Sequence, residues 1–240
     1  MRSSPAIHPT AVVDPSVQIG DRTVIGPFCV ILGPAVIGTD CRIGPHVVIG
    51  TTAEHRNLMT VPPLPEAEKT SDVHDGLWFS GLGAGVHVGD RVIIREFSVV
   101  NQGTHSPTTI GDDSFIMNST YIAHDCQIGN SSSIGPVAAL AGHVWVGHHA
   151  TIGMNAAVHQ HRRIGALAMI GMNATVVSDI SPFCLAKGTP AREASLNRVG
   201  LERAGYSPTA IDSIAKYRSS EGTLPELAER DYAEWTGSTR

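Results

Sequence analysis

Three histidines stand out among the 12 in this sequence of 240 residues, because each follows, within three positions, one of three aliphatic residues that are 18 apart. They are His124, His143 and His159; Asp125 follows the first, and Gly142 precedes the second. A neutral imidazole can remove a proton from a hydroxyl group, a carboxylate can hold that imidazole, and a glycine N–H can bind an oxyanion. These residues predict a transfer reaction in which the acceptor hydroxyl attacks directly, without a serine or cysteine nucleophile.

The elements that must position these residues repeat every six residues. Aliphatic side chains occupy 23 of 23 hexad positions, in runs over 7–49, 88–100 and 110–176, and glycine takes the next position in 13 of them. A six-residue period fits neither an α-helix nor a simple alternating strand, but it fits short strands joined by tight corners in a parallel β-helix.

The fifth position of each hexad is small almost throughout, and three of the four cysteines occupy it: Cys29, Cys41 and Cys126. We interpret them as packing residues rather than as metal ligands or redox groups, because no C-x-x-C spacing accompanies them. Arg162 also stands at this position, where an inward guanidinium would be costly, so a local bulge or a corner is expected there.

The composition agrees with a thin aliphatic core and excludes several classes of protein. Apolar residues make up 42% of the chain and aromatic residues only 5%, as stacked aliphatic ladders require. The net charge of −5 provides no global field for binding nucleic acid, and no apolar run reaches the roughly 20 residues that span a bilayer. Because the N-terminus has no signal-peptide pattern, we expect a cytoplasmic protein.

The repeat sets the domain boundaries. Residues 1–185 are expected to form the β-helix, with a loop excursion at 51–85 where the period is lost. A shorter break contains residues 104–107. An unpatterned segment as long as 51–85 in a compact domain is usually functional or mobile.

Residues 186–240 are expected to form a helical region. One helix is expected over 194–204, a second after the Ser207-Pro208 pair, and a third from Glu226, because a serine cap before a first-turn proline and a Thr-x-x-Glu pattern mark helix starts. We therefore predict a mainly β protein with a small C-terminal α-helical appendage.

Three segments resemble the acyl-[acyl-carrier-protein]–UDP-N-acetylglucosamine O-acyltransferase family, which starts lipid A synthesis. They are residues 121–126 (YIAHDC), 140–144 (LAGHV) and 157–160 (AVHQ), and residues 25–29 and 89–96 agree with the same family. The hexads resemble the hexapeptide-repeat acyltransferases in general. This resemblance implies a left-handed parallel β-helix with three hexads, or 18 residues, in each coil.

The resemblance also implies roles for individual residues. His124 would be the general base on the 3-hydroxyl of a sugar nucleotide, Asp125 would support it, and the N–H of Gly142 would bind the oxyanion. A second group would bind substrates, the sugar nucleotide, the acyl chain or the phosphopantetheine arm of the donor: His143, His159, Gln160, Asn197 and Arg203.

The family further implies a homotrimer with sites between adjacent subunits, and an acyl carrier protein as a partner. The donor substrate would be an acyl-phosphopantetheine thioester, with no bound cofactor and no metal. From Arg162 to Arg203 the chain has six basic residues against three acidic ones, which could attract an acidic carrier protein or its phosphate.

Two residues depart from the family pattern. Tyr121 and Asn101 stand where the family favours histidine, and both positions bear on substrate contacts. In the 51–85 loop, Glu54, His55 and Arg56 are the local candidates for contacting the sugar nucleotide. Because changed polar groups in a site change its preference, we expect poor activity on UDP-N-acetylglucosamine compared with a related amino-sugar nucleotide.

Other functions remain open at this point. Residues 187–192 (KGTPAR) resemble the terminal motif of hexapeptide acetyltransferases that use coenzyme A, although a Gly-Pro turn closing the last coil explains them equally well. A zinc lyase of the γ-carbonic anhydrase type is built on the same prism, and His143 and His148 keep it open. A non-catalytic scaffold, with histidines near one another by chance, is the third alternative.

Overall fold

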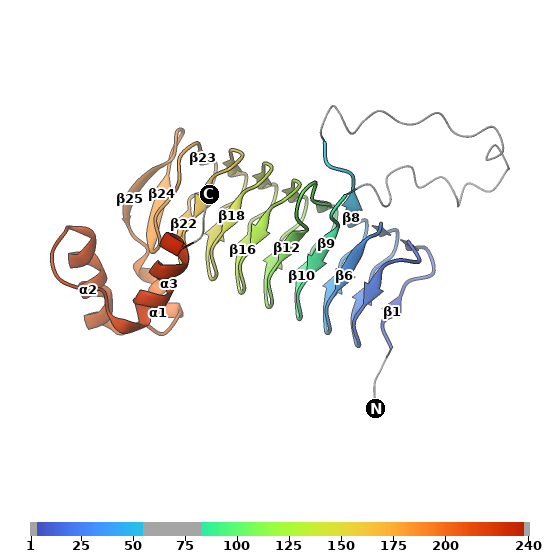
Figure 1. Ribbon diagram of the computed structural model, residues 1–240, viewed down its shortest axis with the longest axis horizontal. Helices are drawn as coiled ribbons and strands as arrows, with labels where there is room; N and C mark the ends of the chain where they lie inside the picture. The colour runs from blue at the N-terminus through green and yellow to red at the C-terminus, as the bar shows by residue number, and fades with distance from the viewer. Residues whose placement is uncertain (1–3, 55–82, 238–240) are drawn as a thin grey trace.

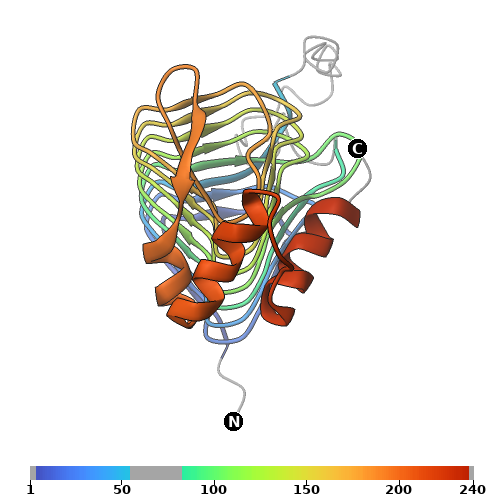
Figure 2. The same cartoon turned by 90° about the vertical axis from the view of Figure 1, so that its left-hand side faces the viewer.

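The computed structural model describes residues 4–54 and 83–237, and it confirms the predicted parallel β-helix with a C-terminal helical appendage (Figure 1). Strands of two to five residues wind into three sheets, and the view along the coils shows a three-sided prism (Figure 2). In the uninterrupted part Tyr121 pairs with Ala139 and Ile122 with Leu140. One coil is therefore 18 residues long, as the resemblance implied.

From β1 to β23 the strands enter the sheets in the order A, B, C, and the last two strands both join sheet A. Sheet A contains β1 (Ala6–Ile7), β4 (Val24–Ile25), β7 (Arg42–Ile43), β10 (Ile93–Ile94), β13 (Phe115–Ile116), β16 (Ser133–Ile134), β19 (Thr151–Ile152), β22 (Met169–Ile170), β24 (Cys184–Lys187) and β25 (Arg192–Leu196). Sheet B contains β2 (Val12–Val13), β5 (Val30–Ile31), β8 (Val48–Thr51), β11 (Val99–Asn101), β14 (Tyr121–Ile122), β17 (Ala139–Leu140), β20 (Ala157–Val158) and β23 (Thr175–Val176). Sheet C contains β3 (Gln18–Ile19), β6 (Ala35–Ile37), β9 (Val86–Val88), β12 (Thr108–Ile110), β15 (Gln127–Ile128), β18 (Trp145–Val146) and β21 (Arg163–Ile164).

The hexad residues form the core of the prism. Those from Ile25 onward are buried, whereas Ile7, in the first of the described coils, is 44% exposed. The cysteines are free and buried, and Cys29 Sγ donates to the carbonyl of Gly44. Burial raises the pKa of Cys126 to about 12. The burial of all four thiols agrees with the interpretation of the cysteines as packing residues.

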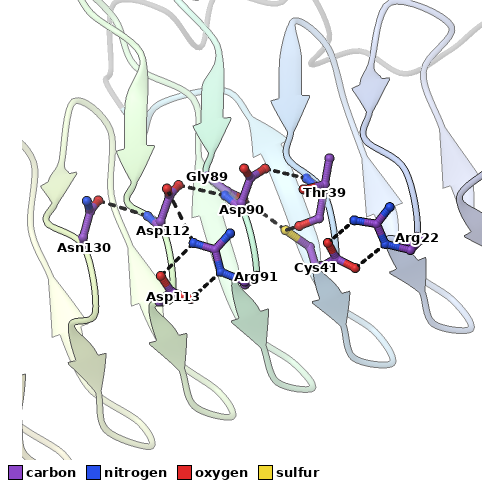
Figure 3. A network of polar contacts seen from close by, with 10 residues as sticks. Arg22, Thr39, Cys41, Gly89, Asp90, Arg91, Asp112, Asp113 and Asn130 are labelled. Atoms are coloured by element: carbon purple, nitrogen blue, oxygen red, sulfur yellow. Dashed lines mark hydrogen bonds and ion pairs between the residues drawn. The ribbon is translucent and has the colours of Figure 1, made fainter. Parts of the chain in front are cut away.

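At the corner between sheets C and A, side chains of three successive coils cap backbone groups of the coil before them (Figure 3). Asn130 Oδ1 accepts from the N–H of Asp112, and Asp112 Oδ1 accepts from the N–H of Asp90. Asp90 Oδ1 in turn accepts from the N–H of Thr39. Since an exposed corner leaves backbone donors unpaired, these carboxylate and amide oxygens satisfy them and fix the stacking of the coils.

The C-terminal region differs from the expectation at its start. Residues 192–196 form β25, which pairs antiparallel with β24, so the helix expected from residue 194 begins later, as α1 (Arg198–Arg203). The hairpin of β24 and β25 extends sheet A, and the backbone hydrogen bonds that it forms outweigh the local helix propensity of residues 194–196. The 187–192 segment forms the turn of that hairpin, where Gly188 has φ +96°, a backbone conformation that favours glycine.

The other two helices begin as expected. α2 (Pro208–Arg218) is capped by Ser207, whose hydroxyl accepts from the N–H of Ala210, and α3 (Glu226–Gly237) follows. α3 lies along the side of the prism (Figure 2). Within the described part of the chain, the helices are all too short and too polar to cross a bilayer.

Candidate active site

The candidate site lies on the corner between sheets B and C, which we call the histidine corner: residues 123–126, 141–144 and 159–162 on three successive coils. The breaks in the six-residue period after β8 and β11 fall at this same corner, two coils and one coil earlier respectively. Two ladders of residues 18 apart run along it, His124–Gly142–Gln160 and Asp125–His143–His161. The six-residue period is therefore interrupted at the histidine corner, where the candidate catalytic residues lie.

Asp125 is the anchor of the site, since its side chain is only 1% exposed. Its carboxylate accepts from the backbone N–H groups of Thr104, His105 and Ser106 at 2.9 Å each, and from the Thr104 hydroxyl at 2.6 Å. Burial alone would raise the pKa of Asp125, but these donors outweigh it and hold the pKa well below its usual range. Asp125 is therefore an ionised acceptor.

His124 is oriented by this carboxylate. Its Nδ1 lies 2.8 Å from Asp125 Oδ2, and since an ionised carboxylate only accepts, Nδ1 must carry the proton of the neutral ring. The lone pair is then on Nε2, which is the atom a general base needs. A Cβ added to Gly142 would stand 2.7 Å from this Nε2 and 2.6 Å from Cε1, so only glycine leaves room for the imidazole.

The N–H of Gly142 completes the arrangement. It has no hydrogen-bond partner among residues 4–54 and 83–237, whereas the corresponding N–H groups of Thr39, Asp90 and Asp112 are capped by the next coil (Figure 3). An uncapped donor beside the Nε2 of His124 provides the geometry in which an oxyanion can form next to a base.

Three further imidazoles stack along the corner. The rings of His143 and His161 are 4.5 Å apart and nearly parallel, at 8°, and His105 lies 6.5 Å from His143. The ring of His143 meets that of His124 edge-on at 5.1 Å. Sequence analysis singled out His143 but not His105 or His161. The direct 18-residue spacing of Asp125, His143 and His161 is the signal that would have found the latter.

His159 and Gln160 lie on the same corner, and both are exposed. His159 Nδ1 is 3.2 Å from the carbonyl oxygen of Gln160. Their side chains are thus available to a ligand on the surface, and their binding roles stay predictions.

The two residues that depart from the family pattern contact each other on sheet B. Asn101 Nδ2 donates to the hydroxyl of Tyr121 at 3.2 Å, and Asn101 Oδ1 accepts from Thr51 at 2.9 Å. Burial, and next the charge and hydrogen bond of Glu54, raise the pKa of Tyr121 to about 12. Of the loop candidates, Glu54 is therefore close to this pair, while His55 and Arg56 lie outside the described residues.

Asn197 and Arg203 lie elsewhere in the chain. Asn197 caps α1, accepting from the N–H of Gly200 at 3.1 Å, and its Nδ2 donates to the carbonyl of Leu167 on the corner between sheets C and A. Arg203 is exposed at the end of α1. One chain alone does not bring these two residues to the histidine corner.

The histidine corner also has to be considered as a metal site. Donor atoms of His124, Asp125 and His143 lie within 4.8 Å of one another, but the oxygens of Asp125 already accept from the loop and from His124. His148, the other candidate ligand, lies on the corner between sheets C and A, where Asp231 and Glu234 hold both its ring nitrogens. Within one chain, the pair of histidines expected for a zinc lyase does not come together.

Known proteins resemble the chain in sequence and in fold. Residues 16–51 and 107–142 match the bacterial transferase hexapeptide (six repeats) family, and residues 179–219 match domain 2 of UDP N-acetylglucosamine O-acyltransferase. The acyl-[acyl-carrier-protein]–UDP-N-acetylglucosamine O-acyltransferase of Thermodesulfovibrio yellowstonii is 42% identical over 214 residues, which cover 88% of this chain and 81% of that protein.

Solved structures agree. The UDP-N-acetylglucosamine acyltransferases of Campylobacter jejuni and Francisella novicida have TM-scores of 0.73 and 0.77 against this chain, at 29% and 27% identity, and each comparison covers 98% of this chain and 92% of the other. Because the sequence identity to the Thermodesulfovibrio yellowstonii enzyme is 42% over 88% of this chain, the chain belongs to the acyl-[acyl-carrier-protein]–UDP-N-acetylglucosamine O-acyltransferase family and is an acyltransferase.

Proposed function

We propose that this enzyme moves an acyl group from the thioester of an acyl carrier protein to the 3-hydroxyl of a UDP-amino-sugar, with His124 as the general base. The observation that carries the proposal is the orientation of one imidazole, whose Nδ1 is bound to the buried Asp125 while its Nε2 lies against Gly142. The names of the relatives support the donor and the acceptor class.

The reaction needs no covalent enzyme intermediate. As the acceptor oxygen attacks the thioester carbonyl carbon, His124 Nε2 takes the hydroxyl proton, and the negative charge of Asp125 stabilises the imidazolium. The carbonyl oxygen becomes an oxyanion that the N–H of Gly142 can bind. When the intermediate collapses, the C–S bond breaks, and the departing thiolate takes the proton back from His124. The products are an ester and a free thiol.

The remaining site residues would bind the substrates. His143, His159 and Gln160 share the corner with the base and are placed to contact a ligand that lies along it. Asn197 and Arg203 would reach a site only from a neighbouring subunit, which supports a homotrimer with sites between its chains.

The test is turnover of His124→Ala with an acyl carrier protein donor. We expect a loss of about 10² to 10⁴-fold, the usual cost of losing a general base, and only a small drop in melting temperature, because Asp125 keeps its donors from residues 104–106 when the imidazole is removed. The control is His8→Ala, in the first coil, which should leave turnover unchanged. Near-normal turnover of a folded His124→Ala protein would remove this residue from the mechanism.

A further inference from the structure

A cavity of about 370 Å³ opens beside the histidine corner, on the side of sheet C. Asp125 borders it, so it adjoins the His124–Asp125 pair. Side chains that can form hydrogen bonds line most of the rest: Ser106, Gln127, His143, Trp145, His161 and Arg162.

Arg162, whose position in the hexad was unexpected, contributes to this lining. The corner interpretation is correct and no bulge is present, because Trp145 still pairs with Arg163 and Val146 with Ile164. The guanidinium points outward instead of into the core: Nη1 lies 3.5 Å from Asp179 Oδ1, and Nε donates to the carbonyl of Gln160 at 3.3 Å.

The groups that remain available in the cavity are mostly donors. Among the described residues, the ring nitrogens of His161 and the Nη2 of Arg162 have no hydrogen-bond partner, and His143 Nε2 is 3.9 Å from Asp125. The two carboxylates that border the cavity are engaged, since loop N–H groups donate to Asp125 and the N–H of Arg163 donates to Asp179 at 3.1 Å. A donor-rich pocket with a guanidinium fits an oxygen-rich anion.

The stacked imidazoles suit such an anion. Burial lowers the pKa of His143, and the nearby His161 and His124 lower it further, although Asp125 opposes them. His143, 4.5 Å from the ring of His161, therefore resists protonation until a negative group binds beside it. Its imidazole can donate to that group while neutral, or take up a proton as the group binds.

The outer wall of the cavity is held in place from α3. The guanidinium of Arg163 lies between the rings of Trp145 and Trp235, at 4.9 and 4.4 Å from their centroids, and its Nη2 donates to the carbonyl of Trp235 at 2.7 Å. This stacking fixes Trp145 and places a second cation at the rim, so the pocket is formed before a ligand binds.

We propose that this cavity, through His143, His161 and Arg162, is a subsite for a phosphate ester of one of the two substrates. The proposal rests on the proposed function, because that function supplies two sources of the same chemistry: the phosphodiester of phosphopantetheine and the diphosphate of the sugar nucleotide. In either case the anion would lie next to the base, and His143 would contact it.

The direct test is calorimetric titration with inorganic pyrophosphate. His161→Phe keeps the stacked ring but removes both nitrogens, and Arg162→Gln removes the charge; each is expected to weaken binding about tenfold, as loss of a charged hydrogen bond does. Arg42→Gln, an exposed cation on sheet A, is the matched control and should bind like the wild type. Equal affinity in all four proteins, or no binding to the wild type, would overturn the subsite.

Steady-state kinetics of the same variants show which substrate supplies the phosphate ester. If the donor phosphate binds here, the variants raise the KM for acyl-phosphopantetheine but not for acyl-pantetheine, which lacks the phosphate. If the acceptor diphosphate binds here, the KM for the sugar nucleotide rises with both donors. Unchanged KM values for every substrate contradict the subsite. If the wild type transfers no acyl group at all, the proposed function fails, while the titration still decides the subsite.

Discussion

Asn101 and Tyr121, on adjacent coils of sheet B, are joined by a hydrogen bond of 3.2 Å between the amide Nδ2 and the phenol oxygen. Both stand where the family pattern favours histidine. Because Asn101 is almost fully buried and Thr51 donates to its Oδ1, a change at either position alters the hydrogen bonds of the other. The two departures form one unit rather than two independent substitutions.

We therefore expect the acceptor preference to depend on the pair. The wild type should have a lower kcat/KM on UDP-N-acetylglucosamine than on a related amino-sugar nucleotide, because polar lining that pairs with one substrate group rejects another. Asn101→His and Tyr121→His should each lower activity, whereas the double variant should be non-additive by about 0.5–3 kcal/mol. A panel of sugar nucleotides with one acyl donor measures this. If UDP-N-acetylglucosamine is the best acceptor of the wild type, the departures do not set preference.

Gly142→Ala is expected to inactivate the enzyme without unfolding it. The added Cβ would meet Nε2 and Cε1 of His124 at 2.7 and 2.6 Å, and the imidazole cannot turn away without breaking its bond to Asp125. We expect kcat to fall by about 10²-fold or more, through displacement of the base. In the control Gly135→Ala, at a corner without this histidine, the added Cβ would meet backbone atoms of the next coil instead. Gly135→Ala should therefore lower the melting temperature more than Gly142→Ala does.

Asp125→Asn tests the tautomer. An amide can direct its NH2 at His124, which would place the proton on Nε2 and leave no base, so we expect a loss in kcat of about 10² to 10⁴-fold. The amide oxygen also replaces an acceptor of loop N–H groups, which should lower stability by about 1–3 kcal/mol. Turnover and chemical unfolding of the same preparation separate the two effects. Full activity with Asn at this position would contradict the assignment of Nδ1 as the donor.

Much of this architecture could be predicted because a six-residue period of aliphatic side chains fits a parallel β-helix, and the resemblance to the family supplied the 18-residue coil. Once the coil length is known, the position of His124 beside Gly142 follows, since the two are 18 residues apart. The partners of Asp125 could not be found in this way: they are backbone groups of residues 104–106, in a segment where the period is broken. Spacing carries no information about such a loop once it leaves the repeat.

The C-terminal region was harder to predict for a different reason. β25 exists because β24 presents an unpaired edge, and a pairing partner of this kind is a tertiary effect that overrides local helix signals. The contacts of α3 with the prism depend on His148, Arg163 and Trp145, which are far from α3 in sequence and follow none of its periodicity.

The attachment of α3 should weaken as pH rises. His148 is bound by Asp231 at Nε2 and by Glu234 at Nδ1, at 2.9 and 2.8 Å, and the hydrogen bond to Asp231 is the main cause that raises its pKa. A raised folded-state pKa contributes stability that is complete below the unfolded value of about 6.5 and is lost as pH rises through the folded value. Tyr206 also donates to Asp231 at 2.8 Å and stays neutral over this range.

Hydrogen exchange of α3 measures this effect. After correction for intrinsic rates, protection of Glu226–Gly237 should be lower at pH 9 than at pH 6. In His148→Gln it should be low at both values, while α2 stays protected as the internal reference. Protection of α3 that does not change with pH in the wild type would show that His148 is not charged in this contact.

A homotrimer with shared sites predicts that two inactive variants can restore activity to each other. His124 lies on the histidine corner, whereas Arg203 follows Asn197, which is bound to Leu167 on another corner, so a site that uses both must take them from different chains. His124→Ala and Arg203→Ala should each be impaired alone. Random co-assembly leaves about a quarter of the sites with both residues intact, so activity should return to about a quarter of the wild-type value.

Light scattering on the same mixture should give three chain masses. If the mixture stays inactive while forming trimers, Arg203 does not act across the interface; a single chain mass would exclude the shared site.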